Sequence, residues 1–146
     1  MSRVDADIDA LKGFHAALVR FRYAQLSAVD RSGAAIEVTR GSLAEKALRR
    51  RSALERCQAE LDECRGRAAQ SVAGEDPVDC SGYSRAVLDA EERLNRVFHW
   101  QQLVESEASD FAGRAGAFRY TLENGLRRAE AHLLAMIRSL EAARDL

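Results

Sequence analysis

The sequence predicts an all-α protein built from two long helices joined by one short loop. Its 146 residues include a single proline, and β-branched residues are few and scattered, which is typical of helices. Apolar residues recur at steps of three and four over most of the chain. Only residues 71–82 interrupt this pattern. We therefore expect one domain, folded as a long antiparallel two-helix hairpin that resembles a coiled coil.

The first predicted arm runs from about residue 5 to about residue 70. Asp5, Asp7 and Asp9 place negative charge at its N-terminal end, where the helix dipole is positive. From Ile36 onward its apolar residues follow a heptad pattern, with Arg40 as one of two basic exceptions. The predicted apolar face of this arm consists of Leu11, Leu18, Val29, Ile36, Leu43, Ala47, Leu54, Cys57, Leu61, Cys64 and Ala68.

The loop is predicted at residues 71–82, because this segment holds two glycines, two serines and the only proline. The second arm runs from about residue 83 to near residue 146. Two arms of near-equal length with a short connection predict antiparallel packing. The apolar face of the second arm consists of Val87, Ala90, Leu94, Val97, Gln101, Val104, Ala108, Phe111, Ala115, Phe118, Leu122, Ala129, Leu133, Met136 and Leu140.

Four glycines lie at one level if the two arms leave the loop side by side. Gly33 and Gly41 on the first arm then come near Gly113 and Gly116 on the second. Each glycine costs a helix about 1 kcal/mol against alanine. Two alternatives explain glycines at one level. Either they let the arms approach closely, or both arms hinge there and fold into a shorter four-helix bundle. We favour an essentially continuous hairpin, with or without a bend at this level.

The same alignment, with Gln70 level with Tyr83, fixes which charges face each other. It sets the basic residues Lys46, Arg49, Arg50 and Arg51 opposite Val104, Glu105 and Glu107. We therefore expect this basic run to be a neutralised flank of the hairpin and not a phosphate-binding patch, although exposed pairs contribute only about 0–1 kcal/mol each.

No spacing in the sequence favours catalysis, a metal or a cofactor. Cys57 and Cys64 are two turns apart on one helix, about 10 Å between their backbones, which is too far to share a zinc ion. Glu130 and His132 miss the Glu-x-x-His spacing of di-iron bundles by one residue. No phosphate-binding glycine loop is present. We expect no catalytic, cofactor-binding or metal-ligating residues.

The three cysteines cannot all pair within one chain. Cys80 lies in the predicted loop, and Cys64 lies in the last two turns before it. A disulfide between Cys64 and Cys80 would clamp the tip of the hairpin in an oxidising setting, whereas reduced thiols are the expectation for the cytoplasm.

Charge and hydropathy restrict the classes of partner. Charged residues make up 31% of the chain, with a formal net charge of -1, whereas binders of nucleic acid or anionic membranes usually carry a basic excess. No apolar stretch approaches the roughly 20 residues of a membrane span, and the acidic N-terminal segment does not resemble a secretory signal. We expect a cytoplasmic protein that binds neither nucleic acid nor membrane, with signal-less export of the folded chain as an alternative.

Apolar residues beyond the two predicted faces gather where the chain termini meet. A two-helix hairpin buries one stripe per arm, so this excess predicts a docking face for another chain or a wider core made by bending. We favour the docking face. The predicted partner-binding residues are Phe14, Phe21, Tyr23, Leu26, Leu126, Leu134 and Ile137.

The hairpin plan resembles the WXG100/LXG-like helical hairpin proteins of type VII secretion and polymorphic toxin modules. The family's Trp-x-Gly turn is absent, because Trp100 is followed by Gln101 and Gln102 well inside an arm. The export motif also differs, because Asn124 stands where an acidic residue would follow Tyr120. The resemblance implies an accessory or chaperone-like partner of such a module.

These observations lead to one preferred function and one alternative. We expect a non-enzymatic helical interaction protein, an adaptor or chaperone that acts by helix–helix packing as a homo-oligomer or in a hetero-complex. The alternative is a self-assembling structural subunit of a larger bundle, ring or filament.

Overall fold

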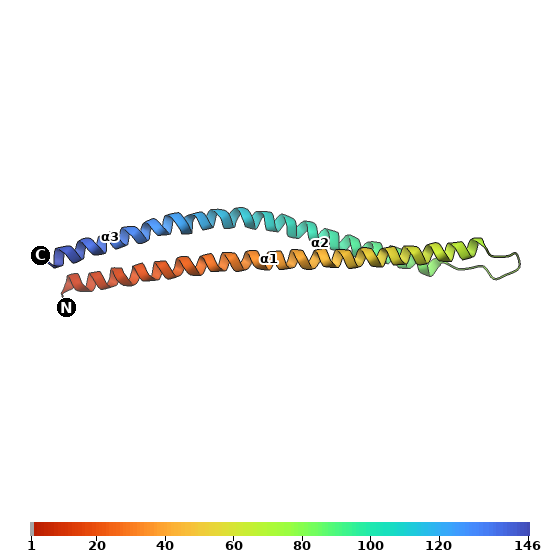
Figure 1. Cartoon of the computed structure of the whole chain (residues 1–146), viewed down its shortest axis with the longest axis horizontal. Coiled ribbons are helices and arrows are strands. Elements are labelled where there is room, and N and C mark those ends of the chain that lie inside the picture. The colour runs from red at the N-terminus through yellow and green to blue at the C-terminus, as the bar shows by residue number, and fades with distance from the viewer. Residues whose placement is uncertain (1) are drawn as a thin grey trace. The chain divides into compact units, whose positions relative to one another are not determined.

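The structure, a computed structural model, describes residues 2–146 (Figure 1). No strand occurs in this range, so the predicted all-α helical hairpin is confirmed. The loop spans residues 70–80, close to the predicted 71–82. The helical elements are α1 (Arg3–Ala69), α2 (Ser81–Tyr120), the π-helical turn η1 (Thr121–Leu126) and α3 (Arg127–Arg144).

Polar side chains explain where α1 and α2 begin. Ser2 and Asp5 cap α1 reciprocally: the Asp5 amide donates to Ser2 Oγ over 3.2 Å, and the Ser2 amide donates to Asp5 Oδ2 over 3.1 Å. This pairing satisfies amides that no helical carbonyl can reach. At the end of the loop, Asp79 Oδ1 accepts a 2.9 Å hydrogen bond from the Ser81 amide at the first residue of α2.

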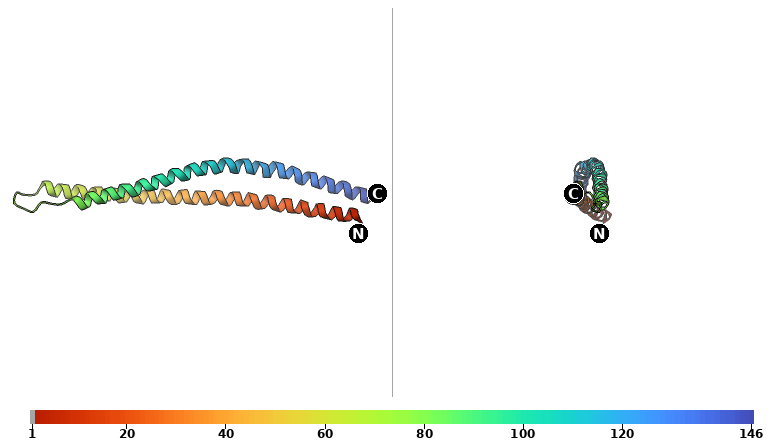
Figure 2. Two further views of the ribbon diagram at one scale, coloured as in Figure 1. Left: turned by 180° about the vertical axis from the view of Figure 1, so that it is seen from behind. Right: turned by 90° about the vertical axis from the view of Figure 1, so that its right-hand side faces the viewer.

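The chain divides into two compact units, which we describe separately. Unit 1 comprises Met1–Ala35 and Ser109–Leu146, and unit 2 comprises Ile36–Ala108. In unit 1 the first half of α1 runs antiparallel to η1 and α3, and the two chain ends lie side by side (Figures 1 and 2). In unit 2 the second half of α1 runs antiparallel to the start of α2, and the loop joins them.

The predicted apolar faces largely form the interior of each unit. Every residue predicted on the face of the first arm is buried or half-buried, and on the second arm only Phe118 and Met136 are exposed. The most buried apolar residues of unit 1 are Ile8, Leu122 and Ile137, and those of unit 2 are Leu61, Cys64, Val87, Ala90, Leu94 and Val97.

The π-helical turn explains why Met136 is not in the core. In a π-helix the backbone bonds to the fifth residue and not the fourth, so the turn inserts one extra residue. The Asn124 side chain donates to the Tyr120 carbonyl over 3.0 Å, and Thr121 Oγ1 donates to the Ala117 carbonyl over 3.2 Å. After this turn the buried positions fall one residue later than predicted, at Glu130 and Ile137.

The glycines neither break the helices nor bring backbones together. α1 is helical through Gly33 and Gly41, and α2 is helical through Gly113 and Gly116. A Cβ built on Gly33 would lie 3.9 Å from the Phe111 ring, an ordinary contact, and one built on any of the other three would meet nothing within 4 Å. The predicted close approach at these glycines is therefore wrong.

The predicted register of unit 2 is also wrong. Cys64 of α1 is bonded to Cys80 just before α2, so the last residues of α1 extend past the start of α2, and Gln70 is not level with Tyr83. Glu105 accepts hydrogen bonds from Arg40, over 2.7 and 3.0 Å. The basic run therefore does not face Glu105 and Glu107, and its Lys46 and Arg50 instead line a hollow with Arg93, Arg96 and Trp100.

Candidate interaction surface

Two phenylalanines on α1 are exposed in unit 1. Phe14 is 55% exposed and Phe21 is 50% exposed. They are seven residues apart, which is two helical turns, so both project from the same face of α1. Large apolar side chains that share a face and remain half exposed mark a surface suited to a partner.

The other predicted partner-binding residues have three different environments. Tyr23 and Leu134 are exposed, whereas Leu26 and Leu126 are half-buried. Ile137 is only 3% exposed and belongs to the core of unit 1, so the expectation that it offers surface to a partner is wrong. Its burial follows from the extra residue in η1.

Three further large apolar side chains of the second arm are exposed in unit 1, although the sequence did not predict them as partner-binding residues. Phe118, Tyr120 and Met136 are each at least 39% exposed. Phe118 and Met136 fit the heptad pattern and were therefore assigned to the buried face. A π-helical turn lies between these two residues and shifts the buried position from Met136 to Ile137. A prediction that included this turn would have placed Met136 on the exposed side.

A buried ion pair lies inside unit 1. Arg22 and Glu130 are 7% and 8% exposed. Arg22 Nε donates to Glu130 Oε1 over 2.9 Å, and its Nη2 donates to Oε2 over 3.3 Å. The hydrogen bonds to Glu130 raise the pKa of the Arg22 guanidinium above its ordinary value, while desolvation lowers it. The guanidinium carbon also lies 4.6 Å from the centre of the Tyr23 ring, a cation–π contact.

Sequence reasoning missed this pair, although a signal for it exists. Arg22 lies one heptad before Val29 and two after Ile8, so the apolar period itself places it on the inner face. Glu130 lies one heptad before Ile137. Because a charge in the interior needs a partner, two opposite charges on inner positions of the two arms specify which residues face each other.

Exposed ion pairs join the arms of unit 1 on either side of this core. Lys12 Nζ lies 2.8 Å from Glu141 Oε1, Arg144 Nη1 lies 3.3 Å from Asp5 Oδ1, and Arg119 pairs with Asp30. The hydrogen bond from Lys12 lowers the pKa of Glu141 below its ordinary value. Hydrogen bonds from Ser2 lower the pKa of Asp5 in the same way.

The loop end of unit 2 carries a disulfide. Cys64 and Cys80 are bonded, with their Cα atoms 5.9 Å apart, within the usual range for a disulfide. This is the pair that the sequence suggests for an oxidising setting. Cys57 is a free, half-buried thiol on the inner face of α1.

Neither a metal-ligand cluster nor a membrane-spanning helix occurs in the described part of the chain. Residues 2–146 contain no group of three or more His, Cys, Asp or Glu side chains placed to hold a metal ion. In the same range, no helix combines the length and the apolar character needed to cross a membrane. No family model, no curated protein and no solved structure matches the chain.

Proposed function

We propose that this protein is a non-enzymatic helical interaction protein that binds an amphipathic helix on the exposed apolar side chains of unit 1. The exposure of Phe14 and Phe21 on one face of α1 is the observation that supports this proposal most directly. The occupant is a helix of a second copy or of a partner protein, because a helical face with apolar side chains two turns apart suits helix-against-helix packing.

The two phenylalanines supply part of the binding free energy that a stable complex needs. Burying an apolar side chain fully is worth about 1.5–3 kcal/mol. The exposed fractions of Phe14 and Phe21, each about half of the side chain, therefore offer about 1.5–3 kcal/mol together. Association itself costs several kcal/mol in lost freedom of motion. Micromolar affinity corresponds to about -8 kcal/mol, so the partner must also bury side chains that neighbour the two phenylalanines.

The buried ion pair supports the same role by fixing the surface. The pairing of Arg22 with Glu130 sets which residues of α1 face α3. The exposed side chains on either side of the pair, including Phe21 and Leu134, are thereby held in one relative position. A preformed surface loses less entropy on binding than a flexible one.

We favour a role as adaptor or chaperone of a secreted helical protein. This preference follows from the resemblance of the hairpin architecture to the helical hairpin proteins of type VII secretion. The second candidate is a structural subunit that assembles with its own kind into a bundle, ring or filament. The same exposed apolar side chains could serve either role. The size distribution of the assembly distinguishes the two roles, because an adaptor forms a small closed complex and a structural subunit grows without limit.

A double substitution of exposed residues tests the proposal. Phe14→Ser combined with Phe21→Ser removes two large apolar side chains that the core of unit 1 does not contain. We expect the variant to lose association at least tenfold, measured by sedimentation, while its far-UV circular dichroism stays helical. Ile137 is unsuitable for this test, because it is buried in the core of unit 1 and a serine there would destabilise the fold.

The matched control carries the same number of Phe- or Leu-to-Ser changes in unit 2. Leu48 and Leu88 are 63% and 64% exposed, somewhat more than Phe14 and Phe21, so Leu48→Ser with Leu88→Ser removes a similar amount of exposed apolar surface. The control is expected to associate like the wild type. Equal weakening by both double variants would mean that general hydrophobicity, and not the unit 1 surface, drives association.

A further inference from the structure

Two shallow hollows follow one another along the same groove between α1 and α2 in unit 2. The first, of about 260 Å³, is lined by Leu43, Lys46, Arg50, Arg93, Arg96, Val97 and Trp100. The second, of about 310 Å³, is lined by Arg50, Ala53, Arg56, Cys57, Ala86, Asp89, Ala90 and Arg93. Arg50 and Arg93 line both hollows, so the two hollows form one groove, which we call the basic groove.

Positive charge in the basic groove greatly exceeds negative charge. Five basic side chains line it, against the single carboxylate of Asp89. Within residues 2–146, no carboxylate lies within 4.0 Å of the basic nitrogens of Lys46, Arg50, Arg56 or Arg93. Arg96 has a partner, Glu92, but that pair is exposed and formed within α2.

The position of Arg50 brings a positive charge to the inner side of the basic groove. Arg50 occupies an inner position of α1, one heptad after Leu43 and one before Cys57, and it is half-buried there. Arg93 approaches the same hollows from α2. Like charges that line one groove repel each other, and an anion bound between them would be attracted to both.

We propose that the basic groove binds a linear oligophosphate, either as an inorganic chain or as the phosphate chain of a nucleotide. Guanidinium groups bind phosphate oxygens through paired hydrogen bonds, and three of the four cations that lack a carboxylate partner are arginines. The cations on α1 lie between Lys46 and Arg56, which are about 15 Å apart along the helix axis. That length suits a row of phosphates better than a single orthophosphate.

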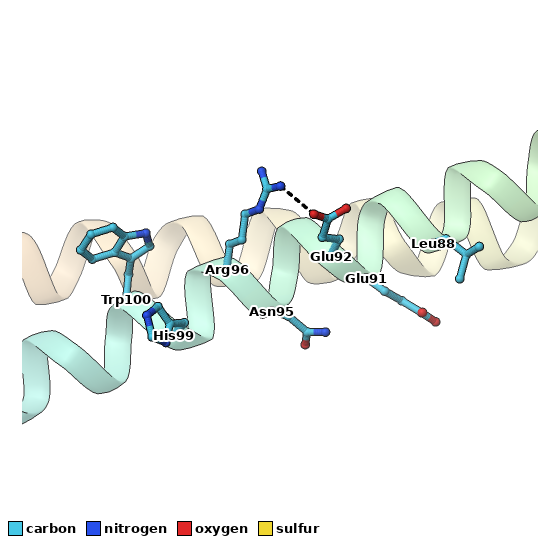
Figure 3. Close-up of a pocket in the computed structure, with 7 residues that line it drawn as sticks. All are labelled: Leu88, Glu91, Glu92, Asn95, Arg96, His99 and Trp100. Carbon is cyan, nitrogen blue, oxygen red and sulfur yellow. Dashed lines mark hydrogen bonds and ion pairs between the residues drawn. The ribbon is translucent and has the colours of Figure 1, made fainter.

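Single-stranded nucleic acid fits the groove less well. Such ligands usually stack successive bases on several aromatic side chains, and the groove offers only Trp100. Acidic residues also border it, because Glu91 and Glu92 line the adjoining hollow of α2 together with Arg96 and Trp100 (Figure 3). A long polyanion would have to pass these carboxylates, whereas a short chain of phosphates would not.

Trp100 provides a direct probe, because it is the only tryptophan of the chain and lines the groove. Inorganic tripolyphosphate is titrated into the full-length protein at low salt, with tryptophan emission and calorimetry as readouts. We expect a saturable change in emission, an affinity that falls as sodium chloride is added, and much weaker binding of orthophosphate. Calorimetry with ATP distinguishes the sources: binding tighter than tripolyphosphate indicates a nucleotide, and weaker binding indicates an inorganic chain.

The test variant is Arg50→Gln with Arg93→Gln, and the control is Arg65→Gln with Arg85→Gln. Each changes one residue on each helix and removes two positive charges, but only the first pair lines the groove. We expect at least tenfold weaker binding for the test variant and less than a twofold change for the control. The unliganded test variant should also melt at a slightly higher temperature than the wild type, because the groove holds fewer mutually repelling positive charges.

Three results would overturn the proposal. One is the absence of both an emission change and binding heat with tripolyphosphate and ATP. Another is equal weakening by the test and control variants, which would indicate a general effect of net charge. The third is tighter binding of a single-stranded oligonucleotide than of tripolyphosphate through Arg50 and Arg93, which would make the groove a nucleic-acid site.

Discussion

Arg22 and Glu130 form a two-point ion pair across the interior of unit 1, with 2.9 Å between Arg22 Nε and Glu130 Oε1. On the second arm, Glu130 lies in sequence between the buried apolar residues Leu122 and Ile137. Removing one member would leave the other charge buried without a partner, which is a strongly destabilising change.

Neutralising one member of this pair should therefore destabilise the fold. We expect Arg22→Gln or Glu130→Gln to lower the melting temperature by roughly 5 °C or more. Arg96→Gln, which breaks only an exposed pair with Glu92, should have a small effect. The exchange Arg22→Glu with Glu130→Arg should recover part of the loss. If the single variants melt like the wild type, the pair does not form in the interior.

Alanine at the open glycines should stabilise the helices. Gly41, Gly113 and Gly116 lie inside helices, and an added Cβ would meet nothing within 4 Å at any of them. Each change to alanine should raise the free energy of unfolding by about 0.5–1 kcal/mol, measured by urea denaturation. Gly74→Ala is the contrasting control, because Gly74 has a φ of 100° and a side chain there is strained. Destabilisation by the three helical changes would mean that those glycines contact another surface.

Oxidised protein should contain the Cys64–Cys80 disulfide and a free Cys57. Peptide mapping after alkylation measures this directly. Reducing the bond should lower the free energy of unfolding by about 3 kcal/mol, the loop-closure value for cysteines 16 residues apart. Cys57→Ser should not change the mapped bond. A Cys57–Cys80 bond would contradict the pairing of α1 with α2 near the loop.

Acid should weaken unit 1 through carboxylates whose pKa values are lowered in the folded state. The hydrogen bond from Lys12 lowers the pKa of Glu141 below its ordinary value, and hydrogen bonds from Ser2 do the same for Asp5. A lowered pKa adds stability above the unfolded value, and this contribution is lost as the pH falls through the folded value. Thermal melting should therefore be flat above about pH 5 and fall below it.

One substitution isolates the Glu141 contribution to this pH dependence. Glu141→Gln should melt lower than the wild type at neutral pH and lose less stability between neutral and acid pH. Glu107→Gln is the control, because Glu107 makes no ion pair within residues 2–146. Parallel pH curves for wild type and Glu141→Gln would exclude Glu141 as a source of the acid sensitivity.

The sequence predicted the helices and their inner faces because both depend on local periodicity. Leu61, Val87 and Leu94 are buried where the heptad pattern places them. The π-helical turn escaped prediction, because it depends on backbone hydrogen bonding that the side chains of Thr121 and Asn124 reinforce. That single extra residue moved Met136 outward and Ile137 inward.

The register of unit 2 escaped prediction for a different reason. Placing Gln70 level with Tyr83 assumed that both helices end at the same height. Cys64 and Cys80 can form a disulfide only if α1 extends past the start of α2, so the cysteine pairing and the assumed register were inconsistent. With the register corrected, Arg50 lies with Arg93 and not with Glu105, which is why the basic groove could not be foreseen.

We propose above all that the exposed apolar side chains of unit 1 bind another helix. Sedimentation equilibrium over a range of concentrations, on protein gently purified from the cells that naturally produce it, tests this claim most directly. We predict a species at least twice the mass of the chain, either a small homo-oligomer or a complex with a bound helical protein, and its loss in Phe14→Ser with Phe21→Ser. A monomer with no bound partner at every concentration would contradict the claim.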